Sequence, residues 1–144
     1  MSLIKLTSKQ RNGKTYQKDV LINLDRVAEP IIENVSNDSI ISLNETPSLQ
    51  NHVNQGANKV QYIVDEDMAT IVALSNKEMF VGTILSRNGK SPVESSVIFI
   101  VKNITGKIEE DTLGCRFLYE EEGDPNPVEY ILSETITDIA TALS

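Results

Sequence analysis

The sequence predicts a β-rich α+β fold made of two tandem copies of a small antiparallel sheet, each closed by one short helix. Two observations predict it. Short apolar segments with strand periodicity are each separated by turn residues. Three of these segments also recur in the same order later in the chain, so the copies would occupy residues 1–76 and 79–144. With 40% hydrophobic and 24% charged residues, the 144-residue chain has the composition of a globular protein.

The repeat rests on three pairs of matched segments. These are 11–14 with 87–90, 20–27 with 97–104, and 60–68 with 128–136. The first pair is the unchanged tetrapeptide Arg-Asn-Gly-Lys. The spacing between matched residues shrinks before the third pair, which locates a length difference in one polar loop, 44–59 in the first copy and 120–127 in the second. Loops tolerate such changes in length. Chance similarity between two β-rich halves is the alternative.

Each copy is expected to begin with a hairpin. Strands at 3–7 and 79–85 are each followed by Asn-Gly, a strong hairpin signal, because a type I′ turn needs positive φ at both central residues. The second strands are expected at 20–24 and 97–101. Their core-facing residues would be Val20, Ile22 and Leu24 in one copy, and Val97, Phe99 and Val101 in the other. Segment 97–101 is apolar on both faces, which predicts a central position in a sheet or between layers.

A third strand, a fourth strand and a helix should complete each copy. The third strand is expected through 31–32 and 40–43, with a counterpart through 108–110 and 115–119, and the fourth strand at 60–64 and 128–132. Apolar residues then fall at helical spacing, namely Met68, Ile71, Val72 and Leu74, and again Ile136, Ile139, Ala140 and Leu143. Asp65 and Ser133 are the predicted N-caps, and Glu66 and Glu134 the predicted acids of the first helical turns.

Each copy of about 70 residues would be marginally stable alone, because so short a chain buries a small share of its surface. We therefore expect the copies to pack on each other or to dock onto something larger. The longest apolar runs are far shorter than the roughly 18 residues that a membrane-spanning helix needs, so no membrane partner is expected.

The charge is uneven along the chain. The net charge is −8, and the acids are concentrated in the second copy. Residues 1–18 contain no acid and five basic residues, the candidate protein-interaction residues Lys5, Lys9, Arg11, Lys14 and Lys18. They would dock on an acidic neighbour. The alternative is a solvated edge hairpin whose lysines discourage aggregation. A nucleic-acid partner is not expected, because the chain is acidic overall and no aromatic residues are interleaved with these bases.

The sequence shows no catalytic, cofactor-binding or metal-binding constellation, so we expect no enzyme and no cofactor. His52 is the only histidine and lies in the polar loop, without metal-ligand partners at suitable spacing. Cys115 is the only cysteine and is expected to be a buried structural thiol in a strand. The acidic run 120–124 lacks the spacing of a calcium loop and is expected to form a solvated hairpin tip.

Three segments of the first copy carry a family resemblance. They are Leu3-Ile4-Lys5-Leu6-Thr7, then Asn12-Gly13-Lys14, and then Leu21 to Val27, followed later by a strand that leads into a helix at 60–71. This pattern is similar to small virion proteins of crAss-like tailed bacteriophages and, more weakly, to small flagellar FlbD-type proteins. Its motifs are structural, so it carries over no catalytic residue.

The phage resemblance implies an auxiliary capsid protein, present in many copies and bound to the major capsid protein or to other virion proteins. Such a protein would be made in the cytoplasm of a bacterial host and would end in the capsid of the virion. The alternative from a different class is a small soluble adaptor or regulatory binding module, of phage or bacterial origin, with a protein partner.

Overall fold

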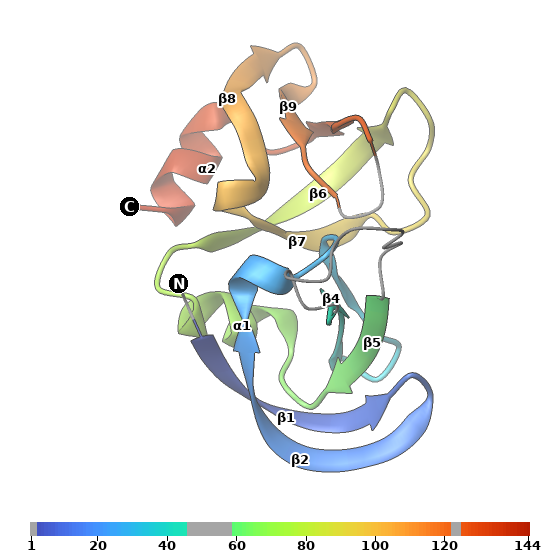
Figure 1. The fold of residues 1–144 in the computed structure, drawn as a ribbon. Coiled ribbons are helices and arrows are strands. Elements are labelled where there is room, and N and C mark those ends of the chain that lie inside the picture. Colours follow the sequence, from blue (N-terminus) through green and yellow to red (C-terminus); the bar gives the residue numbers. More distant parts are fainter. Residues whose placement is uncertain (1–2, 46–58, 122–124) are drawn as a thin grey trace.

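The computed structural model describes residues 3–45, 59–121 and 125–144, and in these residues ten strands and two short helices form a β-rich α+β fold (Figure 1). This confirms the β-rich α+β part of the predicted fold class. The elements of the first half are β1 (Leu3–Arg11), β2 (Lys14–Asn23), β3 (Ile31–Glu33), β4 (Ser39–Asn44), β5 (Lys59–Val64) and α1 (Met68–Leu74). Those of the second half are β6 (Met79–Arg87), β7 (Ser96–Ile100), β8 (Ile104–Asp111), β9 (Gly114–Tyr119), β10 (Val128–Leu132) and α2 (Ile136–Ala142).

All ten strands of the described residues belong to one antiparallel sheet, in the order β2-β1-β5-β4-β3-β7-β6-β10-β9-β8. The two halves meet where β3 pairs with β7, with Ile31 opposite Ile98 and Ile32 opposite Val97. The sequence predicted a separate small sheet for each copy, whereas the structure joins them into one. Figure 1 shows the first half at the lower end of the molecule and the second half at the upper end.

Both Asn-Gly turns have the predicted geometry. Asn12 and Gly13 have φ values of 50° and 81°, and Asn88 and Gly89 have 51° and 79°. The strands around them are longer than predicted. β1 continues to Arg11 because its polar end pairs with β2 on one side and with β5 on the other. Strand pairing thus extends beyond the apolar segments that were visible in the sequence.

The third strand predicted for each copy is wrong, because the structure has two strands in its place. β3 and β4 form a hairpin, and β8 and β9 form another. In the first hairpin residues 34–38 form a tight turn, in which the amide of Asn37 donates to the carbonyl of Asn34 at 3.0 Å and Asn37 adopts a φ of 68°. An asparagine tolerates this left-handed conformation better than most residues.

The helices begin two residues later than predicted, so the N-caps assigned to Asp65 and Ser133 are wrong. The caps are Asp67, which accepts from the amide of Thr70 at 2.9 Å, and Thr135, which forms a capping box with Asp138. Asp65 and Ser133 lie in a bend between the strand and the helix, where their amides donate to the carbonyls of Thr7 and Thr83. No helix in the described part of the chain is long and apolar enough to cross a membrane.

Glu66 and Glu134 also differ from the prediction that placed them in the first helical turns. The carboxylate of Glu66 accepts from the amide of Thr7 at 2.9 Å, and that of Glu134 accepts from the amide of Thr83 at 2.8 Å. Each glutamate therefore binds the middle of the first strand of its half to the segment that precedes its helix. β1 pairs with β5 only from Ser8 onward, and β6 pairs with β10 only from Ile84 onward, so the amides of Thr7 and Thr83 would otherwise lack a strand partner on that side.

Strand β7 contributes to two hydrophobic cores, which confirms the central position predicted from its sequence. Ile98 and Ile100 of β7 join Met79 of β6 in the core of the first half. Val97 and Phe99, on the other face of β7, lie in the core of the second half. The amide of Ile100 donates to the buried Tyr119 hydroxyl at 2.9 Å, and burial raises the pKa of Tyr119 to about 12.

The two cores differ in composition. The first is largely aliphatic, whereas the second contains a cluster of aromatic rings with centroids 4.9–6.3 Å apart. The rings of this cluster belong to Phe80, Phe99, Phe117, Tyr119 and Tyr130. Phe99 lies at its centre and contacts the other four rings. Edge-on packing of this kind adds to the gain from burial alone.

Candidate interaction surface

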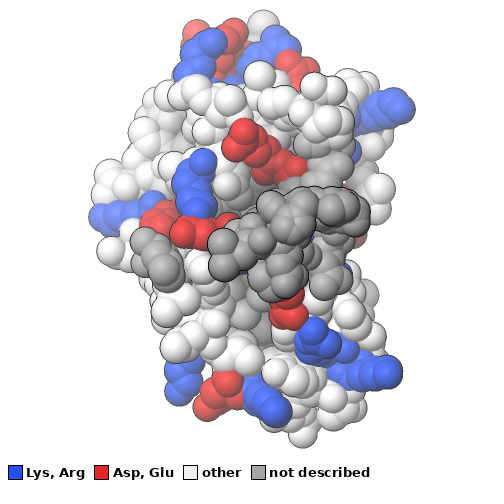
Figure 2. Space-filling view, viewed as in Figure 1, with Lys and Arg blue, Asp and Glu red and all other residues white. Residues whose placement is uncertain are grey.

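The five basic residues predicted to bind a partner all lie on the β1–β2 hairpin, at the lower end of the molecule in Figures 1 and 2. The Asn-Gly turn fixes the tip of this hairpin against β5. The Asn12 amide donates to the Gln61 carbonyl at 2.8 Å, and the Asn12 side-chain oxygen accepts from the Gln61 amide at 2.9 Å. Asn88 makes the same two contacts with Glu129.

Lys9 points to acids of its own half. Its ammonium group binds the Asp38 carboxylate and lies 3.8 Å from a carboxylate oxygen of Asp65. The Asp38 side chain is only 5% exposed, so this ion pair is shielded from solvent on one side. The hydrogen bond from Lys9 lowers the pKa of Asp38 and outweighs the effect of burial. Lys9 therefore contributes to the fold of the hairpin.

Arg11 is held in a three-residue cluster at the end of β1. Its Nε donates to the Tyr62 hydroxyl at 3.1 Å and its Nη2 donates to Glu45 at 2.8 Å, while the Tyr62 hydroxyl donates to the same carboxylate. Burial opposes ionisation of Glu45, but the hydrogen bonds from Tyr62 and Arg11 lower its pKa. Glu45 thus neutralises the charge of Arg11 within the chain.

The second half contains the same arrangement at the end of β6. Arg87 donates to the Tyr130 hydroxyl at 3.3 Å and to Glu121 at 2.8 Å, and the Tyr130 hydroxyl donates to Glu121. Burial, followed by the hydrogen bond to Glu121, raises the pKa of Tyr130. The cluster lines a shallow groove of about 400 Å³ between the halves, together with Ile32 and Val97. The carboxylate in the groove neutralises the guanidinium, so the geometry does not favour an anion here.

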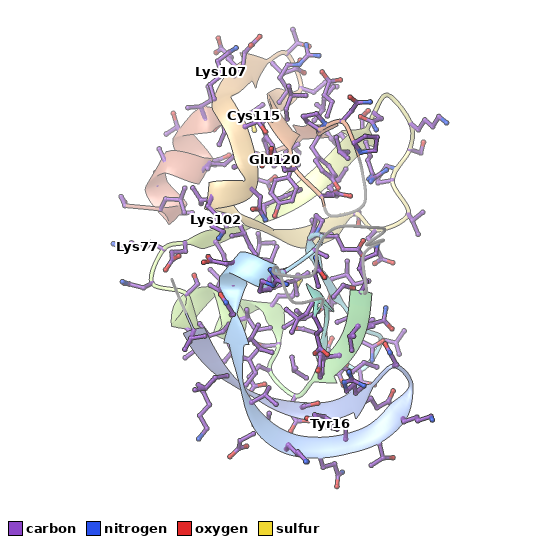
Figure 3. All side chains as sticks on the ribbon, viewed as in Figure 1. Tyr16, Lys77, Lys102, Lys107, Cys115 and Glu120 are labelled. Carbon is purple, nitrogen blue, oxygen red and sulfur yellow. The ribbon has the colours of Figure 1, made fainter. Side chains whose placement is uncertain are left out.

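Three of the five basic residues face outward. Lys5 lies 3.8 Å from the exposed Asp19, the Lys18 ammonium lies 5.2 Å from the centre of the Tyr16 ring, and Lys14 is exposed beside the turn. Figure 3 shows Tyr16 at this end of the molecule. The structure therefore brings Lys5, Lys14 and Lys18 to one exposed hairpin, while Lys9 and Arg11 bind acids of the same half.

Sequence analysis missed the apolar component of this surface. Leu3 and Leu21 are 51% and 64% exposed on the outer face of the hairpin. Leu21 lies opposite Lys5, and Leu3 lies opposite Asn23, in the β1–β2 register. The alternation of Leu21 with Val20 and Ile22 was the available signal, since period 2 turns Leu21 away from the core.

The other predicted features have mixed outcomes. Cys115 is a buried free thiol, as predicted, and burial raises its pKa to about 11. The solvated tip predicted for 120–124 is wrong for Glu121. Its side chain is only 6% exposed because it binds Arg87 and Tyr130. Residues 122–124 and His52 lie outside the described residues. Among the described residues, no group of three or more metal-ligating side chains could hold a metal ion.

Comparisons with protein-family models, with curated proteins and with solved structures find no match to this chain.

Replacing Lys9 with methionine should destabilise the protein at neutral pH, because it leaves the buried Asp38 carboxylate without its cation. The loss should shrink as the pH falls below about 4, where an aspartate in the unfolded chain becomes protonated and the pair no longer favours folding. Urea unfolding of Lys9→Met and the parent protein across this pH range measures it. Lys5→Met is the matched control, since exposed ion pairs contribute at most about 1 kcal/mol. Equal effects of the two variants would contradict the assignment.

The Cys115 thiol should not react with a chromogenic disulfide reagent at pH 8 until the protein unfolds, because burial blocks access and disfavours the thiolate. Leu118→Cys supplies the control, since residue 118 lies on the exposed face of the same strand. That variant should show one fast thiol and one that reacts only in denaturant. Rapid reaction of both thiols under native conditions would show that Cys115 is accessible.

Proposed function

We propose that the chain is a duplicated protein and that it is a non-enzymatic structural component of a bacteriophage virion, an auxiliary capsid protein that binds and stabilises the major capsid lattice. The two parts of this proposal rest on different observations and have separate tests. The duplication concerns how the fold arose from two tandem copies, with boundaries at residues 1–76 and 79–144. The virion assignment concerns what the exposed hairpin binds.

Agreement between the halves in strand order supports the duplication. The order within the first half is β2-β1-β5-β4-β3, and that within the second is β7-β6-β10-β9-β8. The strands correspond one to one when five is added to each number. In both halves the register also shifts at the same place, next to Ser8 in β1 and next to Ile84 in β6.

Repeated polar contacts are further support. The cluster of Arg11, Tyr62 and Glu45 corresponds to that of Arg87, Tyr130 and Glu121. The turn asparagines and the paired glutamates that bind the first strand repeat as well. Such networks need several residue types at fixed positions at once, so chance convergence would have to produce each of them separately.

Two core substitutions that compensate for each other in size also support descent of the two halves from one ancestral copy. Gly82 occupies the position in β6 that the buried Leu6 occupies in β1, and Phe99 occupies that of Ile22. A Cβ at Gly82 would lie 2.8 Å from Phe99 Cε2 and 2.8 Å from Leu132 Cδ1. The larger ring of Phe99 thus fills space that the missing leucine side chain leaves open.

Gly82→Leu should therefore destabilise the protein by about 1–3 kcal/mol, because it overpacks the second core. Phe99→Ile should destabilise it by creating a cavity. The double variant restores the Leu and Ile pair of the first half, so it should lose less stability than the sum of the two, with a favourable coupling of about 0.5–3 kcal/mol in urea unfolding. Losses of unfolding free energy that simply add in the double variant would contradict the equivalence of Gly82 with Leu6 and of Phe99 with Ile22.

The exposed hairpin is the observation that carries the virion assignment. Its strand sequences carry the resemblance to small virion proteins of crAss-like phages. In the structure it presents Lys5 beside Leu21 on its outer face, and Lys14 and Lys18 are also exposed on the same hairpin, a combination that suits an acidic protein surface with apolar contacts. On a lattice, many weak contacts of this kind add up, because each bound copy repeats the same interface.

The virion assignment predicts that the protein is present in purified particles of the phage that encodes it, at a fixed and high copy number per particle. Quantitative mass spectrometry of those particles measures it. Lys14→Glu should reduce incorporation, because it reverses a charge on the exposed hairpin. Lys90→Glu is the matched control, since Lys90 follows the corresponding turn in the second half.

Abundant protein in infected cells together with its absence from particles would contradict the assignment. Recovery with a cellular protein at low stoichiometry would favour the adaptor alternative instead. Both variants should retain the circular dichroism spectrum and urea midpoint of the parent protein, because both lysines are exposed.

A further inference from the structure

At the junction between the halves, each half contributes different elements to the interface. The second half contributes β6 and β7, with Met79, Ile98 and Ile100 inserted into the first core. The first half contributes β3, which pairs with β7, and α1, which packs against β6 and β7. An ion pair between Asp25 and Lys102 crosses the junction.

In the first half, β1 and β2 correspond to β6 and β7, but within the described part of the chain their outer surface has no neighbouring half packed against it. By the equivalence of the halves, Leu3 and Leu21 occupy the positions of Met79 and Ile98. Met79 and Ile98 are 1% and 0% exposed, whereas Leu3 and Leu21 are 51% and 64% exposed. β2 also lies at one end of the strand order, so among the described residues its outer edge has no strand partner.

In the second half, β8 and α2 correspond to β3 and α1, but in the residues that the structure describes their outer surface has no neighbouring half packed against it. β8 lies at the opposite end of the strand order. Ile104 and Ile108 are only partly buried, whereas the equivalent Val27 and Ile31 are fully buried. Ile136 at the start of α2 is 40% exposed, whereas Met68 at the start of α1 is buried.

The two unpartnered sides cannot meet within one chain. They lie at opposite ends of the molecule, with β1 and β2 at the lower end of Figure 1 and β8 and α2 at the upper end. Figure 3 places Tyr16 at one end and Lys107 at the other. A second copy of the chain, however, can present the matching side to each end.

The charges fit such a contact. Asp25 and Lys102 occupy equivalent positions and are paired within each chain, so repeating the junction between copies places this Lys102 near a second Asp25, that of the next copy, again with opposite charges. Repeating the two β3–β7 pairs places Ile108 opposite Leu21 and Glu109 opposite Val20, and continuing the same register places Asp111 opposite Lys18. It also places Glu110 opposite Asp19, whose carboxylate has Lys5 beside it.

We propose that this chain associates head to tail with further copies of itself, with the β8–α2 end of one copy on the β1–β2 end of the next, in the geometry of its own internal junction. The contact is heterologous, so association does not stop at two copies unless a rotation closes a ring. The proposal rests on the proposed equivalence of the halves and does not depend on the virion assignment. Both proposals use the β1–β2 hairpin, so in a head-to-tail assembly only the copy at one end keeps that hairpin free for a lattice.

Analytical ultracentrifugation of the purified full chain tests the proposal over concentrations up to about 1 mM. Species of two, three and more copies should appear as the concentration rises. Leu21→Asp blocks the β2 end and Ile108→Asp blocks the β8 end, so each variant alone should stay monomeric. Mixed together they should form a dimer and nothing larger, because each variant retains one intact end, and the two intact ends match.

Val93→Asp is the matched control, since Val93 is exposed in the loop between β6 and β7 and belongs to neither end, and it should associate like the parent protein. Ile136→Asp replaces Ile108→Asp if the latter lowers the urea midpoint, because Ile136 is the more exposed of the two. A parent protein that is monomeric throughout would overturn the proposal. The proposal would also be overturned if the mixed variants formed no dimer, which is the result expected of a symmetric dimer that uses only β2. Absence of the protein from phage particles would leave the expected self-association unchanged. Additive stability losses for Gly82→Leu and Phe99→Ile would instead contradict the equivalence of the halves on which this proposal rests.

Discussion

The pairing of β3 with β7 is the interaction on which the rest of the structure depends. It makes one sheet from ten strands, and it turns one face of β7 toward the first core and the other toward the second. A half of about 70 residues has little apolar surface to bury by itself. Met79, Ile98 and Ile100 supply one wall of the first core, so that core is complete only when both halves are present.

The polar clusters at the ends of β1 and β6 show how charged groups are paired at the margin of each small core. In each, one carboxylate accepts hydrogen bonds from an arginine and a tyrosine. The arginine also supports the tyrosine hydroxyl, so the charged groups neutralise one another. The clusters link β1 to β5 and β6 to β10, while Lys5, Lys14 and Lys18 of the hairpin stay exposed.

Local signals in the sequence located the turns, the central strand β7 and the buried Cys115, because each depends on a few adjacent residues. The division of the third strand was missed because residues 34–38 form a turn without a glycine or proline. The helix caps were misplaced because the amides of Asp65 and Ser133 donate to Thr7 and Thr83, which are far away in sequence, so each chain bends there before its helix begins. For the same reason the sequence could not show that Lys9 and Arg11 bind acids of their own half.

The shared strand also constrains the order in which the chain can fold as it is synthesised. Synthesis proceeds from the N-terminus, and domains usually fold as they emerge from the ribosome. Here β1 to β5 emerge before Met79, Ile98 and Ile100, which complete their core. A nascent first half therefore remains open on one side until β7 has left the exit tunnel, and its exposed apolar wall makes that interval the period of greatest exposure to chaperones and proteases.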